Sequence, residues 1–558
     1  MREAAPVADP GPSAVRTSAA RLLGTDQPND LAAVAALFVV YAVIERATRS
    51  VAVVGPGDLG RFSLVVAAVA HRWWVVAALV VAAGVGTARQ PGRMLAAWND
   101  LEQGRVLRLL GGSLILVVAW QSSLYDYNWL AGQTHGLDRI LVAVLAAAAL
   151  VRPAFLVPFV LVVRVVNDQF LLPFDTAAGR NIDDLLLLAL LAIAAAHLLY
   201  VITGRNRTAA AVLLMTAALA AHFFIPGKGK LAIGWLSSGD LSNLPLASYT
   251  AGWLGHTNGR WAEVLSGFYE RFRWPVMVGT VGLELGAIVA VLHPRLTRLW
   301  LPGWIVFHLM TFATTGFWFL PWIVVEVGLL TILRLPSLRS WVAENATPAR
   351  GLLAAVAVLG APVLFHPPGL AWLDAPLSYG YEVEGTGVSG AAYHVPISAF
   401  GPLSHHVAFD RLQLGSTVPV SGAYGAVATA AEVAALEPIT DFDQLTAYEA
   451  TFARPTLVPA SQSFMMTFLE YANRPRTTNW SWLGSPDHFW TSRPEPSYHF
   501  QEPLAGLQVF LVRSIHHDGH PDRQRQRVLT LAIDSAGATT AEGSSDGRGR
   551  AVVVSGAD

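Results

Sequence analysis

The 558-residue sequence contains no cysteine, which excludes disulfides, thiol catalysis, iron–sulfur clusters and cysteine-ligated zinc. Charged residues are also scarce, at 14% against ~25% in an average soluble protein. Neither sign of charge is in excess, because the net charge is −1, so a nucleic-acid partner is not expected. These shortages exclude a soluble globular enzyme, a disordered chain and a coiled coil.

Apolar residues are abundant instead, at 53% of the chain, and they occur in long runs. A helix needs ~20 apolar residues to cross a bilayer. The runs predict an all-α polytopic membrane domain with about 9–11 transmembrane helices. The predicted spans are roughly 31–54, 63–86, 108–125, 137–152, 154–172, 183–203, 208–226, 275–293, 300–316, 319–334 and 351–366.

Arginine placement predicts how the chain is oriented in the cell membrane. Arginines fill alternate breaks between the apolar runs, as around Arg21, Arg93 and Arg207. Positively charged loops stay in the cytoplasm, so we expect a cytoplasmic N-terminus and an extracytoplasmic C-terminal domain in a multi-pass protein. Arg271 and Arg273 are exceptions, because they fall in a loop on the opposite side.

Composition divides the chain into four parts. We expect residues 1–27 to be a disordered cytoplasmic tail and residues 28–366 to be the transmembrane domain. Residues 367–535 are richer in Gly, Pro, Ser and Tyr, with short alternating runs that predict an extracytoplasmic β-rich domain. Residues 536–558 are rich in Gly and Ser and are expected to be a disordered tail.

Within the β-rich domain, residues 508–515 and 527–533 predict two strands around a turn at 516–520. This turn carries three histidines, His516, His517 and His520. Histidine clusters can bind metal, but this spacing matches no standard site. No metal is therefore expected in the protein.

Lys228 and Lys230 are the only lysines in the chain. A lysine in a low-dielectric environment can lose its proton and act as a base, which an arginine cannot. Both lysines lie at the predicted outer end of a span, and each disfavours the charge on the other. The alternative is that they snorkel to lipid phosphates.

Other titratable residues in the apolar part are candidates for function, because charged groups within a membrane are energetically costly. The predicted orientation places His135, Asp183 and Asp184 at the outer leaflet with the lysines. Each also has a structural explanation, such as the favourable placement of acids at a helix N-terminus or hydrogen bonding between helices. The remaining candidates are His222, Glu284, His308 and Glu326.

Four motifs resemble the vitamin K-dependent gamma-carboxylase and its bacterial relatives, the HTTM family. The first runs from His222 through Pro226-Gly227-Lys228-Gly229-Lys230-Leu231 to Trp235 and Gly239. The second is Phe307-His308-Leu309-Met310 followed by Gly316, Phe317, Phe319 and Pro321. The others are Asn181-Ile182-Asp183-Asp184-Leu185-Leu186 and Thr134-His135-Gly136. The motifs occur in family order, and the similarity covers roughly residues 30–335.

The resemblance implies a reaction in which a lysine acts as base on a reduced quinone, molecular oxygen adds, and an epoxide forms. Lys230 matches that lysine, Lys228 is its neighbour, and His135 and His308 match histidines that hold the quinol oxygens. Neither a metal nor a flavin is implied. Two departures argue against carboxylation of a protein, because Gly229 separates the lysines and Leu-Ser-Ser-Gly follows Trp235.

We therefore expect a membrane enzyme that oxygenates a hydroquinone or a prenylated, lipid-like substrate. Its partners would be the lipid bilayer, a small amphiphilic or isoprenoid substrate and a quinone reductase. One alternative is an isoprenoid cyclase with Asp183 or Asp184 as proton donor, and another is a non-catalytic scaffold or transport protein. The residues expected to bind substrate are Asp183, Asp184, His222, Trp235 and Phe317.

Overall fold

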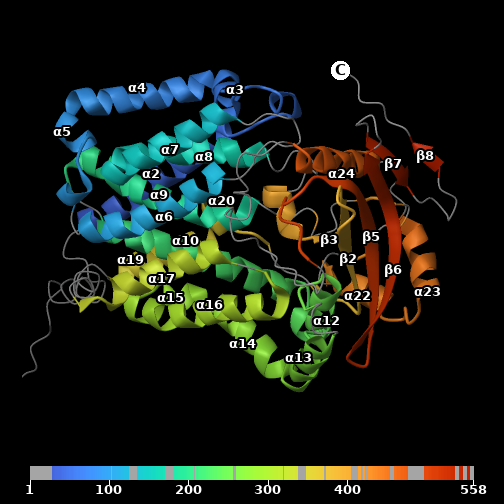
Figure 1. The fold of residues 1–558 in the computed structure, drawn as a ribbon. Coiled ribbons are helices and arrows are strands. Elements are labelled where there is room, and N and C mark those ends of the chain that lie inside the picture. The colour runs from blue at the N-terminus through green and yellow to red at the C-terminus, as the bar shows by residue number, and fades with distance from the viewer. Residues whose placement is uncertain are drawn as a thin grey trace, which may run out of the picture.

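The computed structural model has a helical part joined to a β-sheet part (Figure 1). The expected tail at 1–27 lies outside the residues that the structure describes. These residues are 28–101, 104–124, 135–169, 180–205, 208–254, 259–317, 319–336, 347–369, 373–403, 407, 413–415, 417, 419–421, 425–452, 458–474, 496–533, 539–543 and 550–552.

The helical part is a bundle in which the longest helices run roughly side by side (Figure 1). Runs of Leu, Ala and Val satisfy their own backbone hydrogen bonds as helices, which an apolar environment requires. The helices are α2 (Pro28–Val51), α3 (Leu64–His71), α4 (Trp73–Arg89), α5 (Pro91–Met94), α6 (Gly104–Leu124), α7 (Gly136–Val151), α8 (Leu156–Asp168), α9 (Arg180–Thr203), α10 (Thr208–Ala232), α11 (Trp235–Ser238), α12 (Asn243–Thr250), α13 (Arg260–Arg271), α14 (Arg273–Leu285), α15 (Ala287–Ala290), α16 (Pro294–Thr315), α17 (Leu320–Arg334), α19 (Pro348–Leu359) and α20 (Ala361–Leu364).

Four helices of the described part, α2, α6, α9 and α10, are long and apolar enough to cross a membrane. The pair α3 and α4 adds a fifth if its 90° bend lies within one broken span. Other expected spans are divided into shorter helices. The span expected at 275–293 is divided at Gly286, between α14 and α15. A Cβ on Gly286 would lie 2.5 Å from the ring of Trp300, so a larger residue does not fit there. The helical membrane part is thus confirmed, while the larger number of spans stays a prediction.

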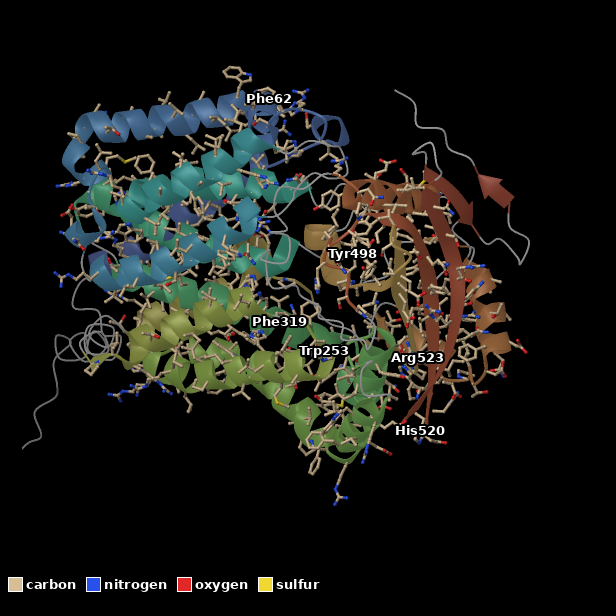
Figure 2. The ribbon with its side chains drawn as sticks, in the orientation of Figure 1. Phe62, Trp253, Phe319, Tyr498, His520 and Arg523 are labelled. Atoms are coloured by element: carbon tan, nitrogen blue, oxygen red, sulfur yellow. The ribbon has the colours of Figure 1, made fainter. Side chains whose placement is uncertain are left out.

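The surface of the helical part is apolar in many places. Large side chains such as Trp73, Val81 and Leu109 are exposed, and Phe62 points outward from the bundle in Figure 2. Contiguous apolar surface of this kind marks contact with a membrane or another protein. The distribution agrees with a bundle that is surrounded by lipid.

Charged side chains also occur inside the bundle, where α2, α8 and α9 meet. Arg49 forms ion pairs with Glu45 on its own helix and, at 2.6 Å, with Asp184 on α9. Arg164 on α8 lies 3.5 Å from both carboxylates and donates to Thr48 at 2.6 Å. We call Glu45, Arg49, Arg164 and Asp184 the charge cluster, and its two positive and two negative charges balance.

The C-terminal part is built on an antiparallel sheet, which confirms the predicted β-rich region. The strands lie in the order β3-β2-β5-β6-β7-β8. A separate pair, β1 and β4, aligns Asp374 with Ala426. The bounds are β1 (Leu373–Asp374), β2 (Leu377–Gly387), β3 (Ala392–Val395), β4 (Ala426–Val427), β5 (Leu504–His517), β6 (His520–Ile533), β7 (Thr539–Gly543) and β8 (Arg550–Val552).

The predicted hairpin is confirmed, although its strands are longer than expected. β5 and β6 pair from Gly506 to His517, and the turn between them is Asp518-Gly519. Both turn residues have positive φ angles, 48° and 78°, as the tight turn of a two-residue hairpin requires. An Asp-Gly pair adopts positive φ angles with little conformational strain, so this pair in the sequence is a strong indication of a hairpin turn.

Two features of the C-terminal part differ from the prediction. The expected disordered tail contains β7 and β8, which extend the sheet beyond β6. These short segments contain β-prone Thr and Val, and an open strand edge offers them hydrogen bonds. Among its described residues this part also contains the helices α22 (Ala430–Leu436), α23 (Phe442–Glu449) and α24 (Val458–Ala472).

The sheet is attached to the helical part through α12 and α13 (Figure 1). Gly380 on β2 lies so close to α12 that a Cβ would be 2.9 Å from the carbonyl oxygen of Thr250. The guanidinium of Arg523 covers the ring of Tyr249 at 4.5 Å. At the tip of the hairpin, His520 Nδ1 lies 3.0 Å from a carboxylate oxygen of Glu263 on α13.

His516 on β5 predicts how the stability of this part depends on pH. Its Nε2 lies 3.0 Å from Ser378 Oγ, and burial lowers its pKa to about 3. In the unfolded chain the same imidazole has its ordinary pKa of 6.5. The free energy of unfolding therefore rises with pH between about 3 and 6.5, because the unfolded state binds more protons there. We expect His516 alone to make the protein about 2 kcal/mol less stable at pH 5 than at pH 7.

His516→Gln should remove this part of the pH dependence, because glutamine keeps a polar side chain and does not titrate. Chemical denaturation of the detergent-solubilised protein at pH 5 and pH 7, followed by fluorescence, measures it. His499→Gln is the control, because His499 is exposed and should leave the dependence unchanged. Equal pH dependence in the two variants would show that His516 is not the responsible group.

Candidate functional site

A cavity of about 190 Å³ lies among α10, α14, α16 and α17, near their junction with the sheet part. Its walls are mainly aromatic and aliphatic, and Phe319 lies inside the molecule at this junction in Figure 2. The β1–β4 pair contributes Asp374 and Ala426 to the wall. Segments that are far apart in the sequence therefore line the same cavity.

Lys230 and Glu284 form an ion pair in this cavity. Lys230 is on the last turns of α10 and is 8% exposed, while Glu284 on α14 is 3% exposed. Lys230 Nζ donates to Glu284 Oε1 at 2.7 Å, and Nζ lies 5.8 Å from the centre of the Trp235 ring. Glu284 Oε2 is buried and has no hydrogen-bond partner among the described residues.

Gly227 allows the two helices to approach closely enough for this pair. A Cβ on Gly227 would lie 2.7 Å from the Cβ of Glu284, which is closer than two such atoms can approach. Any larger residue at this position would push α14 away from α10. The glycine before Lys228 is therefore a packing requirement of the Lys230–Glu284 pair.

His222 lies two turns before Lys230 on α10 and lines the same cavity. Its Nδ1 donates to the carbonyl oxygen of Ala218 at 2.7 Å, which leaves Nε2 as an acceptor without a partner in the described part. Pro226 has no amide hydrogen, so the His222 carbonyl also lacks its usual helical donor. This segment offers a ligand the Nε2 acceptor of His222.

His308 on α16 is held by Glu326 on α17, with 3.0 Å between Nδ1 and the nearer carboxylate oxygen. Both side chains are buried. The imidazole stacks on Phe319 with ring centres 4.7 Å apart and meets the face of Trp322 edge-on. The contact with Glu326 lacks hydrogen-bond geometry among the described residues, so it orients the imidazole by charge and packing.

The structure brings together five of the predicted site residues and separates others from them. Lys230, His222, His308, Trp235 and Phe317 all line the cavity. Lys228 is on α10 but is exposed and outside the lining. Two lysines two residues apart point to different sides of a helix, so only one of them can face the cavity.

His135 does not join this group, contrary to the expectation. It begins α7, with a φ of 44°, and donates from Nε2 to the carbonyl oxygen of Arg61 at 3.0 Å. Burial lowers its pKa, so it is neutral at physiological pH. The nearby Asp138 accepts from the backbone amide of Leu64, which fixes α3 against α7 and gives this region a structural role.

Asp184 is also outside the cavity, because it belongs to the charge cluster. Arg49 and Arg164 contact its carboxylate, so Asp184 has a structural role in holding helices together. Asp183 lies on α9, and its side chain is not among those that the structure describes. The expected role of these residues in binding substrate therefore finds no support at Asp184.

Some lining residues were not in the set expected to bind substrate. Glu284 was a candidate as a charged group within the membrane part, and it bridges α10 and α14 by accepting from Lys230. Tyr269 on α13 and Asp374 on β1 had no motif that could reveal them. Burial raises the pKa of Tyr269, a hydrogen bond with Thr314 acts in the opposite direction, and the Asp374 carboxylate raises it further. Tyr269 and Asp374 both line the cavity.

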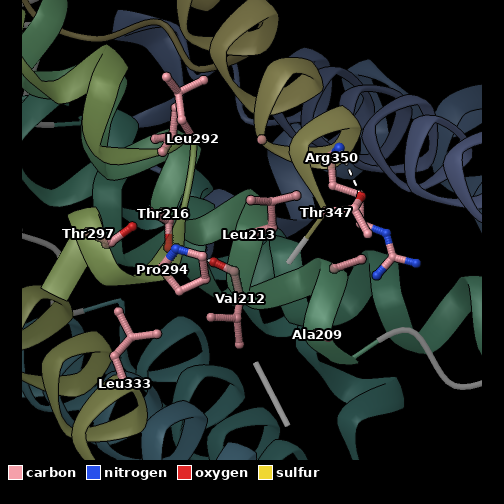
Figure 3. A pocket seen from close by; sticks show the side chains of 13 residues that line it. Ala209, Val212, Leu213, Thr216, Leu292, Pro294, Thr297, Leu333, Thr347 and Arg350 are labelled. Atoms are coloured by element: carbon pink, nitrogen blue, oxygen red, sulfur yellow. Dashed lines mark hydrogen bonds between the residues drawn. The ribbon is translucent and has the colours of Figure 1, made fainter. Parts of the chain in front are cut away.

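Other pockets lie elsewhere in the molecule. One at the sheet has a volume of about 470 Å³ and a charged lining that includes Glu382, Arg523 and Arg525, so it does not suit an apolar ligand. A pocket of about 40 Å³ lies at the opposite end of α10, lined by residues such as Ala209, Pro294 and Arg350 (Figure 3). It is too small for an amphiphile. Within the described ranges, no group of three or more His, Asp or Glu residues is arranged to hold a metal ion.

No family model matches the sequence, and neither a curated protein nor a solved structure was found to match it.

Proposed function

We propose that the protein is a membrane enzyme that binds a hydroquinone or a similar hydroxylated, lipid-like aromatic and removes a hydroxyl proton. The observation that supports this most is the cavity itself. It combines an aromatic wall with two pairs of a basic side chain and a carboxylate, Lys230–Glu284 and His308–Glu326. Apolar pockets with a few convergent polar groups are typical binding sites for small amphiphiles.

The first step follows from the pairing of Lys230. Lys230 acts as a base only after losing its own proton, whereas Glu284 Oε2 is already an acceptor without a partner in the described part. The quinol O–H bond breaks, the proton moves to Glu284, and the electron pair stays on the quinol oxygen. Lys230 remains an ammonium and stabilises this anion, because opposite charges attract strongly where water is excluded.

Molecular oxygen is the oxidant in the following step, as the motif resemblance implies. Overall, one quinol and one O₂ give one quinone epoxide and one water, so two quinol hydrogens leave as water. His308 is placed to hold the second quinol oxygen. A quinone reductase would return the product to the reduced state.

The cyclase alternative is less well supported by the geometry. Cyclisation needs a carboxylic acid that gives up a proton to an alkene. Asp184 is held as a carboxylate by Arg49 and Arg164, and it does not line the cavity. A scaffold or transport role would not require the Lys230–Glu284 pair. The labelling experiment with variants of this pair distinguishes such a role from an enzyme.

Membrane vesicles that contain the protein, supplied with reduced quinones under ¹⁸O₂, test the proposal by mass spectrometry of the extracted lipids. Glu284→Gln should lower label incorporation by about 10²–10⁴-fold, the usual contribution of a general base. Lys230→Arg keeps the positive charge and should lose much less. Glu270→Gln is the control, because Glu270 is exposed on α13.

The outcomes separate the two base assignments. Loss of activity in Lys230→Arg with retention in Glu284→Gln would assign the base to Lys230. Full activity in both variants would contradict proton transfer at this pair. An absence of label in every quinone tested with the wild-type protein would exclude oxygenation of quinols.

A further inference from the structure

Helix α13 carries a stripe of large apolar side chains on its outer face. Trp261 is 58% exposed, Val264 53% and Phe268 46%. Their spacing of three and four residues places them on one side of the helix. The inner face packs against the protein through the buried Ala262 and Tyr269.

The stripe continues where α13 turns into α14. Phe272 and Trp274, on either side of Arg273, are exposed as well. Arg260 and Arg271 at the two ends of α13 are exposed and positively charged. This arrangement, with Trp and Phe on one face and arginines beside them, is typical of helices that lie on a membrane.

Helix α13 is too short to cross a bilayer. Its 12 residues span about 18 Å, whereas the hydrocarbon core is about 30 Å thick. The next helix, α14, begins after one residue and carries the buried Glu284 into the bundle. Helix α13 is therefore held beside the end of the bundle by α14, with its apolar stripe facing away from the protein.

We propose that α13 lies in the plane of the membrane surface, with Trp261, Val264 and Phe268 inserted at the boundary between headgroups and acyl chains of an anionic bilayer. Arg260 and Arg271 contact lipid phosphates at its ends. This placement explains the two exceptional arginines, Arg271 and Arg273. Arg271 ends the surface-bound helix and Arg273 begins α14 two residues later, so neither lies in a loop that follows the rule for cytoplasmic charge.

The placement also brings the cavity next to the lipid. Tyr269 lines the cavity from the inner face of α13, so a single helix separates the cavity from the membrane surface. Val276 and Thr280 of α14 continue the same wall. An amphiphile that arrives with its polar end at the headgroups is then at the depth of the cavity.

The absence of cysteine makes a direct test practical, because a single cysteine can be introduced at any site. Val264→Cys and Phe268→Cys report on the stripe, and Glu270→Cys is the matched control on the exposed polar side. Each variant is labelled with a nitroxide and reconstituted in phosphatidylcholine vesicles containing phosphatidylglycerol. Electron paramagnetic resonance then compares collisions with oxygen, which partitions into lipid, and with a water-soluble nickel chelate.

We expect the ratio of oxygen to nickel collisions to exceed one at 264 and 268 and to fall below one at 270. A ratio below one at both stripe positions would overturn the proposal, because the stripe would then face water. Spin–spin broadening that disappears when labelled protein is diluted with unlabelled protein would also overturn it, because a second copy would then cover the stripe. Quenching of Trp261 by brominated lipid, measured as the difference between wild type and Trp261→Phe, checks the same placement without a label.

Discussion

Arg164→Met is expected to lower the free energy of unfolding of the protein by about 3–5 kcal/mol, since it removes one positive charge from a buried balanced cluster. Glu45 and Asp184 would then share only Arg49, and one buried carboxylate charge would be left uncompensated. Methionine fills most of the volume, so the loss is chiefly electrostatic. Denaturant titration of the protein in detergent micelles measures the change.

Two further variants show whether charge balance is the cause. Arg46→Met removes an exposed arginine from α2, one residue after Glu45. It should change the free energy of unfolding by less than about 0.5 kcal/mol. The double variant Arg164→Met with Asp184→Asn restores neutrality and should be more stable than Arg164→Met alone. If the double variant were the less stable of the two, charge balance would not explain the cluster.

Gly227→Ala is expected to destabilise the protein by about 1–3 kcal/mol and to disrupt the Lys230–Glu284 pair. The added Cβ would lie 2.7 Å from the Cβ of Glu284 and 3.3 Å from the backbone nitrogen of Leu285, so α14 must move away from α10. Denaturant titration measures the stability. The quinol assay described above should show a loss of activity in the same variant.

Gly282→Ala on α14 is the matched control, because a Cβ there would have no atom within 4 Å. Alanine in an open helical position is expected to stabilise the protein by about 0.5–1 kcal/mol. The two glycine substitutions should therefore have opposite signs. A destabilisation of equal size in both would indicate that helix backbone effects, and not the contact with Glu284, determine the result.

Much of the architecture could be predicted from the sequence because its signals are local. Long apolar runs indicated a helical membrane part, and short alternating runs with an Asp-Gly turn indicated the β5–β6 hairpin. The aromatic and histidine-bearing segments near Lys230 and His308 indicated one site, because unusual residue types stood out against an apolar background. The motif resemblance favoured Lys230 over Lys228, and the structure shows that Lys230 is the one that faces the cavity.

The rest of the candidate site depends on how helices are arranged around one another, which the sequence pattern does not contain. Arginine placement indicates the depth of a residue in the membrane but not its position around the bundle. His135 and Asp184 were therefore expected near Lys230 and lie elsewhere. Asp374 is more than 140 residues from Lys230, and no motif connects the two positions.

The β5–β6 hairpin runs about 45 Å from end to end, as its 14-residue strands imply. It lies along α12, and its tip meets α13 through His520 and Glu263 (Figure 1). Across the bulge at Val509 and Phe510, the hairpin connects the outer end of the sheet with the helix that carries Tyr269.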